Sequence, residues 1–162
     1  MKTGSPETAV ALVCISLLVA LTVTGCGGGT GEQESAEIHW LEDLDTALLT
    51  AREVRKPLMI DFTATWCPPC RKMEDSTFSN TEVIRKARSF VTLRIDVDKQ
   101  RDIAVKYNGN ARKYGGVGIP NILFMTAGEK RLRHIIGYYG PDRLVAVMDS
   151  VLTIALTDKG EG

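Results

Sequence analysis

The sequence predicts an α/β domain in which a mixed central β-sheet is flanked by helices. Two observations carry this prediction. Apolar runs of strand length alternate with segments of helical periodicity, and the last strands form a hairpin followed by a helix. With 162 residues, the chain is long enough for one domain with a core. Its 20 basic and 20 acidic residues balance, which excludes the basic surface typical of nucleic-acid-binding proteins.

The first half of the domain is predicted from periodicity and from its breakers. Four apolar residues recur at helical spacing before Lys56-Pro57, which ends that helix: Leu44, Ala47, Leu48 and Ala51. Thr81 is expected to cap a later helical piece. In order, the expected elements are an edge strand (38–40), this helix (44–51), a strand (58–64) and a helix opened by two cysteines (67–75). A break (77–80) and a second helical piece (82–88) follow.

The second half continues with a strand over 90–97 and a helix-prone stretch over 102–114, which Asn108-Gly109-Asn110 interrupts. Two further runs read as a hairpin around Ala127-Gly128: 121–126 and 131–136. Pro141 can occupy the first turn of a final helix. The apolar residues expected on its buried face are Leu144, Val145, Met148, Val151 and Leu152.

The N-terminus predicts a lipoprotein signal peptide over residues 1–25. Lys2 precedes an apolar run over 9–23, which is shorter than the roughly 20 residues of a spanning helix. Small residues directly before Cys26 resemble the bacterial lipobox, which implies lipidation of Cys26. A plain secretory peptide cleaved nearby is the alternative. We therefore expect a lipid-anchored protein of the bacterial cell envelope that faces the periplasm or extracytoplasmic space.

This prediction divides the chain into four parts. After the signal peptide, residues 26–37 form a flexible Gly-rich linker that begins at the lipidated Cys26. Residues 38–157 form the folded domain, and residues 158–162 form a tail. Cys14 is removed with the signal peptide, so the exported domain keeps two free thiols, those of Cys67 and Cys70.

Cys67 and Cys70 are three positions apart, and this spacing lets their sulfurs cycle between dithiol and disulfide. Such a bridge closes almost no loop, so it stabilises little, and we interpret the pair as chemical rather than structural. As the N-cap of the next helix, Cys67 would face the positive helix end, which favours the nucleophilic thiolate. Cys70, one turn into the helix and expected to be less exposed, would then resolve the mixed disulfide.

Other readings of the pair need residues that the chain lacks. A zinc site needs two more ligands, and only His39 and His134 are available, without ligand spacing. A c-type haem attachment needs a histidine where Arg71 stands. An inert pair remains a third alternative. We expect no metal and no organic cofactor.

Trp66 lies directly before Cys67. Its ring either gives a partner polypeptide a flat apolar surface to bind or packs inside the domain.

The stretch Asp61-Phe62-Thr63-Ala64-Thr65-Trp66-Cys67-Pro68-Pro69-Cys70-Arg71-Lys72 resembles the active-site segment of the thioredoxin superfamily. Residues 113–120 resemble that family's segment ending in a cis-proline, and the similarity covers about 38–152. Residues 72–83 most resemble the C-terminal domain of the transmembrane reductant conductor DsbD. The Pro-Pro dipeptide also resembles tryparedoxin and nucleoredoxin. The resemblance implies a thioredoxin-like fold.

The resemblance also implies roles for single residues. Asp61 matches the family's buried carboxylate, whose pKa desolvation raises and which accepts the proton of Cys70. Arg94 falls where thioredoxins carry a lysine, although an exposed strand residue is an equal alternative. Pro120 would be cis, with Ile119 presenting its backbone to an extended substrate. The stretch before Pro120 is longer than in a minimal thioredoxin, around 108–110, so partners cannot be inherited from the family.

Together these features predict a membrane-tethered thiol–disulfide oxidoreductase of the envelope. It would reduce disulfides in exported proteins or relay electrons from a membrane donor of DsbD or CcdA type. An oxidant or isomerase of exported proteins, or a thiol donor to cytochrome c maturation or a peroxidase, is the alternative. A docking or chaperone module that uses the peptide groove without turnover is a reading of a different class.

Overall fold

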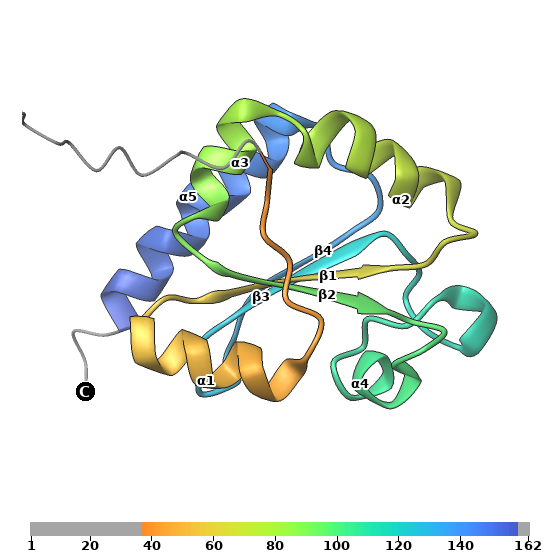
Figure 1. Cartoon of the computed structure of the whole chain (residues 1–162), viewed down its shortest axis with the longest axis horizontal. Coiled ribbons are helices and arrows are strands. Elements are labelled where there is room, and N and C mark those ends of the chain that lie inside the picture. The colour runs from red at the N-terminus through yellow and green to blue at the C-terminus, as the bar shows by residue number, and fades with distance from the viewer. Residues whose placement is uncertain (1–36, 159–162) are drawn as a thin grey trace, which may run out of the picture. The chain divides into compact units, whose positions relative to one another are not determined.

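The computed structural model describes residues 37–158, which fold around one four-stranded sheet with strand order β2-β1-β3-β4 (Figure 1). β1 (Leu58–Thr63) runs parallel to β2 (Val91–Asp96) and antiparallel to β3 (Asn121–Met125). β3 pairs antiparallel with β4 (Arg131–Ile136). The predicted mixed sheet and hairpin are confirmed.

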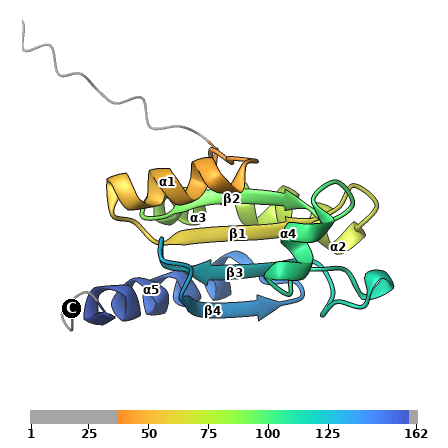
Figure 2. The same cartoon turned by 90° about the horizontal axis from the view of Figure 1, so that it is seen from below.

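Helices cover both faces of this sheet (Figures 1 and 2). On one face lie α1 (Leu44–Val54) and α4 (Arg101–Lys106), and on the other lie α3 (Thr81–Ala87) and α5 (Pro141–Asp158). α2 (Pro68–Met73) continues directly into a π-helical turn, η1, at Glu74–Phe78. A short 3₁₀ turn, η2, follows α4 at Arg112–Tyr114. The order of strands and helices confirms the α/β fold class.

The two faces of β1 lead to two apolar cores, because side chains alternate along a strand. Leu58, Ile60 and Phe62 pack with the α1 side, whereas Met59 packs with the α3 and α5 side. Asp61 lies between Ile60 and Phe62 and is also buried. A carboxylate in the middle of this strand is therefore held away from water.

Three predicted boundaries are wrong. Instead of an edge strand over 38–40, one parallel bridge joins Leu41 to Leu93. The break predicted at 77–80 comes two residues later, at Ser79 and Asn80, because Thr77 is buried and its hydroxyl donates to the Tyr139 carbonyl (2.7 Å) within the π-helical turn. The cap of α3 is Asn80, whose side chain accepts the N–H groups of residues 82 and 83.

The remaining predictions about the chain ends fall largely on residues that are not described. The predicted signal peptide 1–25, residues 26–36 of the predicted linker with Cys26, and the tail after Asp158 lie outside the described residues. Their roles stay predictions. Within residues 37–158, no helix is both long enough and apolar enough to cross a bilayer.

Candidate active site

Cys67 and Cys70 form a disulfide where β1 passes into α2, and their Cα atoms lie 5.3 Å apart. Cys67 is the N-cap of α2, with extended backbone angles, and its Sγ accepts the N–H of Cys70 at 3.2 Å. Pro68 and Pro69 occupy the first turn, where a missing N–H leaves no helical bond unmade. The predicted capping geometry is confirmed.

The expected difference in exposure between the two cysteines is wrong. Cys67 is 2% exposed and Cys70 is 6% exposed, so neither sulfur is open. Both pack into the core on the α1 side, but Cys70 also borders a cavity of about 500 Å³. Exposure therefore does not show which cysteine attacks and which resolves. The feature that distinguishes the two is the contact between the Cys67 sulfur and the helix N-terminus.

Asp61 lies in β1 and makes an ion pair with Arg94 of β2, its neighbour in the parallel register. The Nε of Arg94 donates to Oδ2 of Asp61 at 3.1 Å. Burial raises the pKa of Asp61 to about 6, although the charge and hydrogen bond of Arg94 lower it. The predicted burial of Asp61 is confirmed. Of the two alternatives for Arg94, the structure shows the residue paired with this carboxylate.

Arg94 links this buried carboxylate to the surface. Its Nη2 donates to Oε2 of Glu74 at 2.5 Å, and its guanidinium stacks over Trp40 at 4.3 Å from the ring centroid. Arg94 and Glu74 line the same cavity as Cys70. Sequence reasoning missed Glu74, and its position four residues after Cys70 on one helical face was the available signal.

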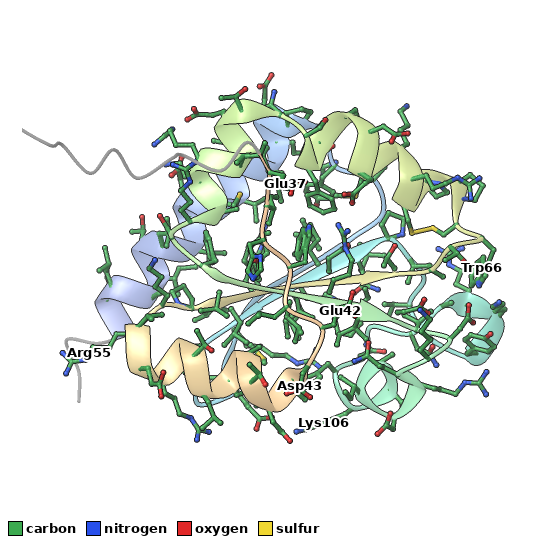
Figure 3. All side chains as sticks on the ribbon, in the orientation of Figure 1. Glu37, Glu42, Asp43, Arg55, Trp66 and Lys106 are labelled. Carbon is green, nitrogen blue, oxygen red and sulfur yellow. A yellow bond between two sulfur atoms is a disulfide. The ribbon has the colours of Figure 1, made fainter. Side chains whose placement is uncertain are left out.

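Trp66 lies at the end of the molecule that carries the disulfide (Figure 3) and is 42% exposed. Its indole N–H donates to Asp98, and the Tyr114 hydroxyl donates to the other oxygen of that carboxylate. These two bonds, that of Tyr114 first, lower the pKa of Asp98. Lys113 Nζ lies 3.6 Å from the indole centroid. Trp66 is thus held in one orientation.

Pro120 follows a cis peptide bond after Ile119, as predicted, and Ile119 packs against the core cluster that contains Cys67. The next residue, Asn121, is buried and was missed by sequence reasoning. Its Nδ2 donates to the carbonyls of Gly109 (2.9 Å) and Gly118 (2.6 Å). Asn121 therefore ties both ends of the stretch before Pro120 to the start of β3.

The predicted break over 108–110 is confirmed, since α4 ends at Lys106 and Asn108 has a left-handed φ of 57°. A Cβ on Gly109 would lie 2.3 Å from the Phe62 ring, so only glycine lets the chain pass there. We call residues 108–118 the groove segment. It lies at the end of the molecule that carries α2, as both views of the ribbon show (Figures 1 and 2).

Among residues 37–158, no group of three or more His, Cys, Asp or Glu side chains is placed to hold a metal ion. His134 instead lies with its Nε2 at 3.1 Å from Oδ1 of Asn121. Burial and nearby Arg131 lower the pKa of His134. The reactive groups at the site are the two cysteine sulfurs and the buried carboxylate of Asp61, with the apolar ring of Trp66 directly before Cys67 in the chain.

Comparison with known proteins identifies the family. Residues 39–127 match the protein family described as thioredoxin-like. The thiol:disulfide interchange protein DsbD of Campylobacter jejuni is 30% identical over 90 residues, which cover 56% of this chain but only 15% of DsbD. Thioredoxin H3 of Arabidopsis thaliana is 35% identical over 98 residues, which cover 60% of this chain and 75% of that protein.

Solved structures share the fold. The DsbH oxidoreductase has a TM-score of 0.58 at 22% identity, covering 74% of this chain and 88% of that one. The oxidised C-terminal domain of Neisseria meningitidis DsbD has a TM-score of 0.54 at 23% identity, covering 68% and 97%. The chain belongs to the thioredoxin-like family, and its Cys67–Cys70 pair makes it a thiol–disulfide oxidoreductase of that family.

Proposed function

We propose that the protein is a membrane-tethered reductant of the bacterial envelope that reduces disulfides in exported proteins. The observation that carries the chemistry is the Sγ of Cys67, which accepts the Cys70 N–H at the positive end of a helix. The lipobox-like sequence before Cys26 supports the tether and the envelope location. The similarity to a segment of DsbD supports exported disulfides as substrates.

The reaction has two exchange steps. The Cys67 thiolate attacks one sulfur of the substrate disulfide, so a mixed disulfide forms and the other substrate sulfur leaves as a thiolate. The Cys70 thiol then loses its proton and attacks Sγ of Cys67, which releases the second substrate thiolate. Two electrons have passed to the substrate, which takes up two protons, and the protein is left with the disulfide seen in this structure.

Asp61 accepts the proton that Cys70 must lose. A carboxyl group with a pKa of about 6 is mostly ionised at neutral pH and still basic enough to take a proton. Cys70 borders a cavity with Glu74 and with Arg94, the ion-pair partner of Asp61, so water in this cavity would connect the thiol to the carboxylate by way of Arg94. Trp66 and the Ile119 backbone hold the substrate chain during both steps.

A thiol donor in the membrane, of DsbD or CcdA type, returns the protein to its dithiol form. The reduction potential of the Cys67–Cys70 pair decides the direction in which electrons flow. We expect a value near that of thioredoxin, about −270 mV, whereas a value near about −120 mV is typical of an oxidant. Equilibration of the full chain with glutathione or dithiothreitol couples, read by mass spectrometry after thiol blocking, measures it.

Trapping tests the substrate class. A Cys70→Ala variant cannot resolve, so exported proteins accumulate as mixed disulfides on Cys67 in cells. A Cys67→Ala/Cys70→Ala variant is the matched control, because it keeps Cys14 and Cys26 and loses only the redox pair. Capture of exported disulfide proteins by the single variant alone supports the proposal. Equal capture by both variants, or capture of cytochrome c maturation proteins alone, contradicts it.

The tether is tested separately. We expect an alkyne fatty acid fed to cells to label the wild-type protein and to leave Cys26→Ser unlabelled. Cys14→Ser is the control, since that residue lies in the predicted signal peptide. Equal labelling of Cys26→Ser and wild type would exclude lipidation at this position.

A further inference from the structure

The groove segment forms one wall of a cavity of about 340 Å³ beside the disulfide. Its other lining residues come from the active-site turn and from the end of β4. The lining residues are Trp66, Ala111, Arg112, Lys113, Val117, Gly118, Ile119, Ile136 and Gly137. The floor is apolar, the only charged residues that line it are cationic, and no acidic side chain is among them. A substrate chain that pairs with the Ile119 backbone would therefore pass two positive charges.

The two cations differ in their partners. Lys113 is already engaged, because its Nζ lies 3.5 Å from Oδ1 of Asp98 and over the Trp66 ring. Arg112 is exposed, and its Nε donates to the Val117 carbonyl at 3.5 Å. Among the residues that the structure describes, no carboxylate pairs with Arg112. A carbonyl does not neutralise a guanidinium, so its charge is available to a ligand.

Arg112 is also held over the groove. Its side-chain stem lies against Gly118, where a Cβ would meet Nε and Cγ of Arg112 at 3.2 and 3.3 Å. Gly118 has a φ of +110°, and its carbonyl is bound by Asn121. Packing thus fixes the arginine next to the segment that leads into Pro120. A positioned arginine suits a carboxylate, which it can bind through two parallel hydrogen bonds.

Arg71 repeats this pattern beside the second cysteine. Its Nη1 donates to the Thr65 carbonyl at 2.7 Å, and within residues 37–158 it has no carboxylate partner. Two arginines with only carbonyl acceptors therefore stand beside the redox pair, Arg71 after Cys70 and Arg112 over the groove. Most other charges at this end are paired, as in Lys99 with Asp96 and Arg94 with Asp61. Unneutralised positive charge is concentrated where a substrate docks.

We infer that the groove segment selects disulfide substrates with an acidic side chain close to the attacked cysteine, which Arg112 binds. This inference rests on the proposed function and names its substrate class. The apolar floor accepts a neighbouring apolar side chain, and the arginine supplies the charge discrimination. Charges at the rim of an interface act on association and choice of partner more than on total affinity.

Three peptides of equal length test the inference, each with one cysteine joined to a chromophoric aryl thiol. Glu, Gln or Lys flanks the cysteine, and all else is identical. The Cys67 thiolate of the reduced full-length chain attacks the sulfur of the peptide cysteine. The protein–peptide disulfide forms, the S–S bond to the aryl thiol breaks, and absorbance follows the released aryl thiolate. We expect the Glu peptide to react about fivefold faster than the Lys peptide at low salt, since an exposed ion pair contributes up to roughly fivefold.

Variants assign the preference to one residue. Arg112→Gln keeps a polar side chain without the charge and should lower the Glu-to-Lys rate ratio about threefold, and Arg112→Glu should bring it below one. Arg52→Glu is the matched control. Arg52 also donates through Nε to one carbonyl, that of Ala127 (3.3 Å), but it lies with Arg55 and Pro57 at the other end of β1. Its ratio should equal that of the wild type, and about 1 M salt should reduce the preference.

The possible outcomes distinguish a failure of the acidic-substrate preference from a failure of the proposed function. An unchanged ratio in Arg112→Glu, or equal rates for the three peptides with wild type, overturns the inference while exchange activity remains. Failure of every peptide and of a simple aryl disulfide to react overturns the proposed function and the inference with it. Thermal unfolding of each variant, followed by circular dichroism, shows whether a lost preference reflects a lost fold.

Discussion

Asp61 and Asp98 are two carboxylates near one redox pair, and their surroundings give them opposite properties. Asp61 is buried in β1, where desolvation raises its pKa to about 6 against the effect of Arg94. Asp98 is exposed after β2, where hydrogen bonds from Tyr114 and Trp66 lower its pKa. Burial, rather than the presence of a nearby cation, decides which carboxylate can exchange a proton near neutral pH.

Asp61 and Asp98 also differ in the residues that they contact. Asp61 is paired with Arg94, which shares a cavity with Cys70, and the proposed proton transfer depends on this connection. Asp98 stays ionised and holds Trp66 and Tyr114 in place by accepting their hydrogen bonds. In the proposed mechanism Asp61 takes part in the chemistry, whereas Asp98 fixes the side chains beside the disulfide.

The largest expected effect is that of Asp61→Asn on the resolving step. An amide cannot accept the Cys70 proton, so release of the second substrate thiol should slow by about 100-fold at pH 7. Stopped-flow measurement of that release in the wild type should show an inflection near pH 6, which the variant lacks. Asp98→Asn is the matched control and should keep the inflection. A pH profile that is the same in Asp61→Asn and wild type contradicts the proton transfer.

The second effect is on stability. The folded pKa of Asp61, about 6, lies above its ordinary value of 3.8, so the folded state holds the proton more tightly. Its contribution to the unfolding free energy is fully present below about pH 4 and is lost as pH rises through 6. At 1.36 kcal/mol per pH unit, the loss is about 3 kcal/mol. Urea unfolding of the oxidised wild type and of Asp61→Asn from pH 4 to 7 measures it.

Asp98 should behave in the opposite sense. Its folded pKa is lowered, so its contribution to stability is present above its ordinary value of 3.8 and is lost as pH falls further. Asp98→Asn should therefore destabilise the protein at neutral pH and have no such effect under strongly acidic conditions. The same urea series checks this. Parallel pH dependences for Asp61→Asn and Asp98→Asn would remove the distinction between the two carboxylates.

Arg94→Met sharpens the comparison by removing the cation beside Asp61. The pH inflection of thiol release should move upward by about 1–3 pH units, because an adjacent opposite charge depresses a carboxyl pKa by that amount. Methionine keeps apolar contact with Trp40, which Arg94 covers. Glu74→Gln leaves Arg94 in place and removes a negative charge that raises the pKa of Asp61, so it should not move the inflection upward. An unmoved inflection in Arg94→Met would mean that a group other than Asp61 titrates.

The smallest effect is expected for Trp66→Phe. The ring surface is kept, but the N–H that donates to Asp98 is lost, which costs about 1 kcal/mol of stability. The rate of exchange with a small aryl disulfide should change by less than about threefold. This corresponds to a change in activation free energy no larger than the loss of stability. Chemical denaturation and stopped-flow absorbance give both values. A loss of exchange as large as that of Asp61→Asn would place Trp66 in the chemistry instead.

The elements that local patterns specify could be predicted from the sequence. The helix over Leu44–Val54 shows its buried stripe, and Cys67 at the end of an apolar run before Pro68 predicts a capped helix. The edge strand at 38–40 could not be judged, because pairing there depends on β2, more than fifty residues away. The cap at Asn80 was displaced by one residue because Thr81 is an equally good capping type.

The site divides in the same way. The sequence and the family resemblance specify the two sulfurs, Asp61 and Pro120. Asp98 and Asn121 act through contacts with residues distant along the chain, so no local pattern marks them. Glu74 is marked only by its position four residues after Cys70, and its bond to Arg94 is not local. The relative exposure of Cys67 and Cys70 depends on a cavity bordered by four separate segments, and a position within one helix cannot predict it.

The most direct test of the account is the order in which the two thiols of the reduced protein are alkylated. Cys67 alone caps the helix with its sulfur, so it should react first as the thiolate. With limiting iodoacetamide near pH 7 and mass spectrometry, we expect Cys67 to be modified on the order of tenfold faster than Cys70, as for thiols that differ in thiolate fraction. Equal modification, or faster modification of Cys70, would contradict the assignment of Cys67 as the attacking sulfur.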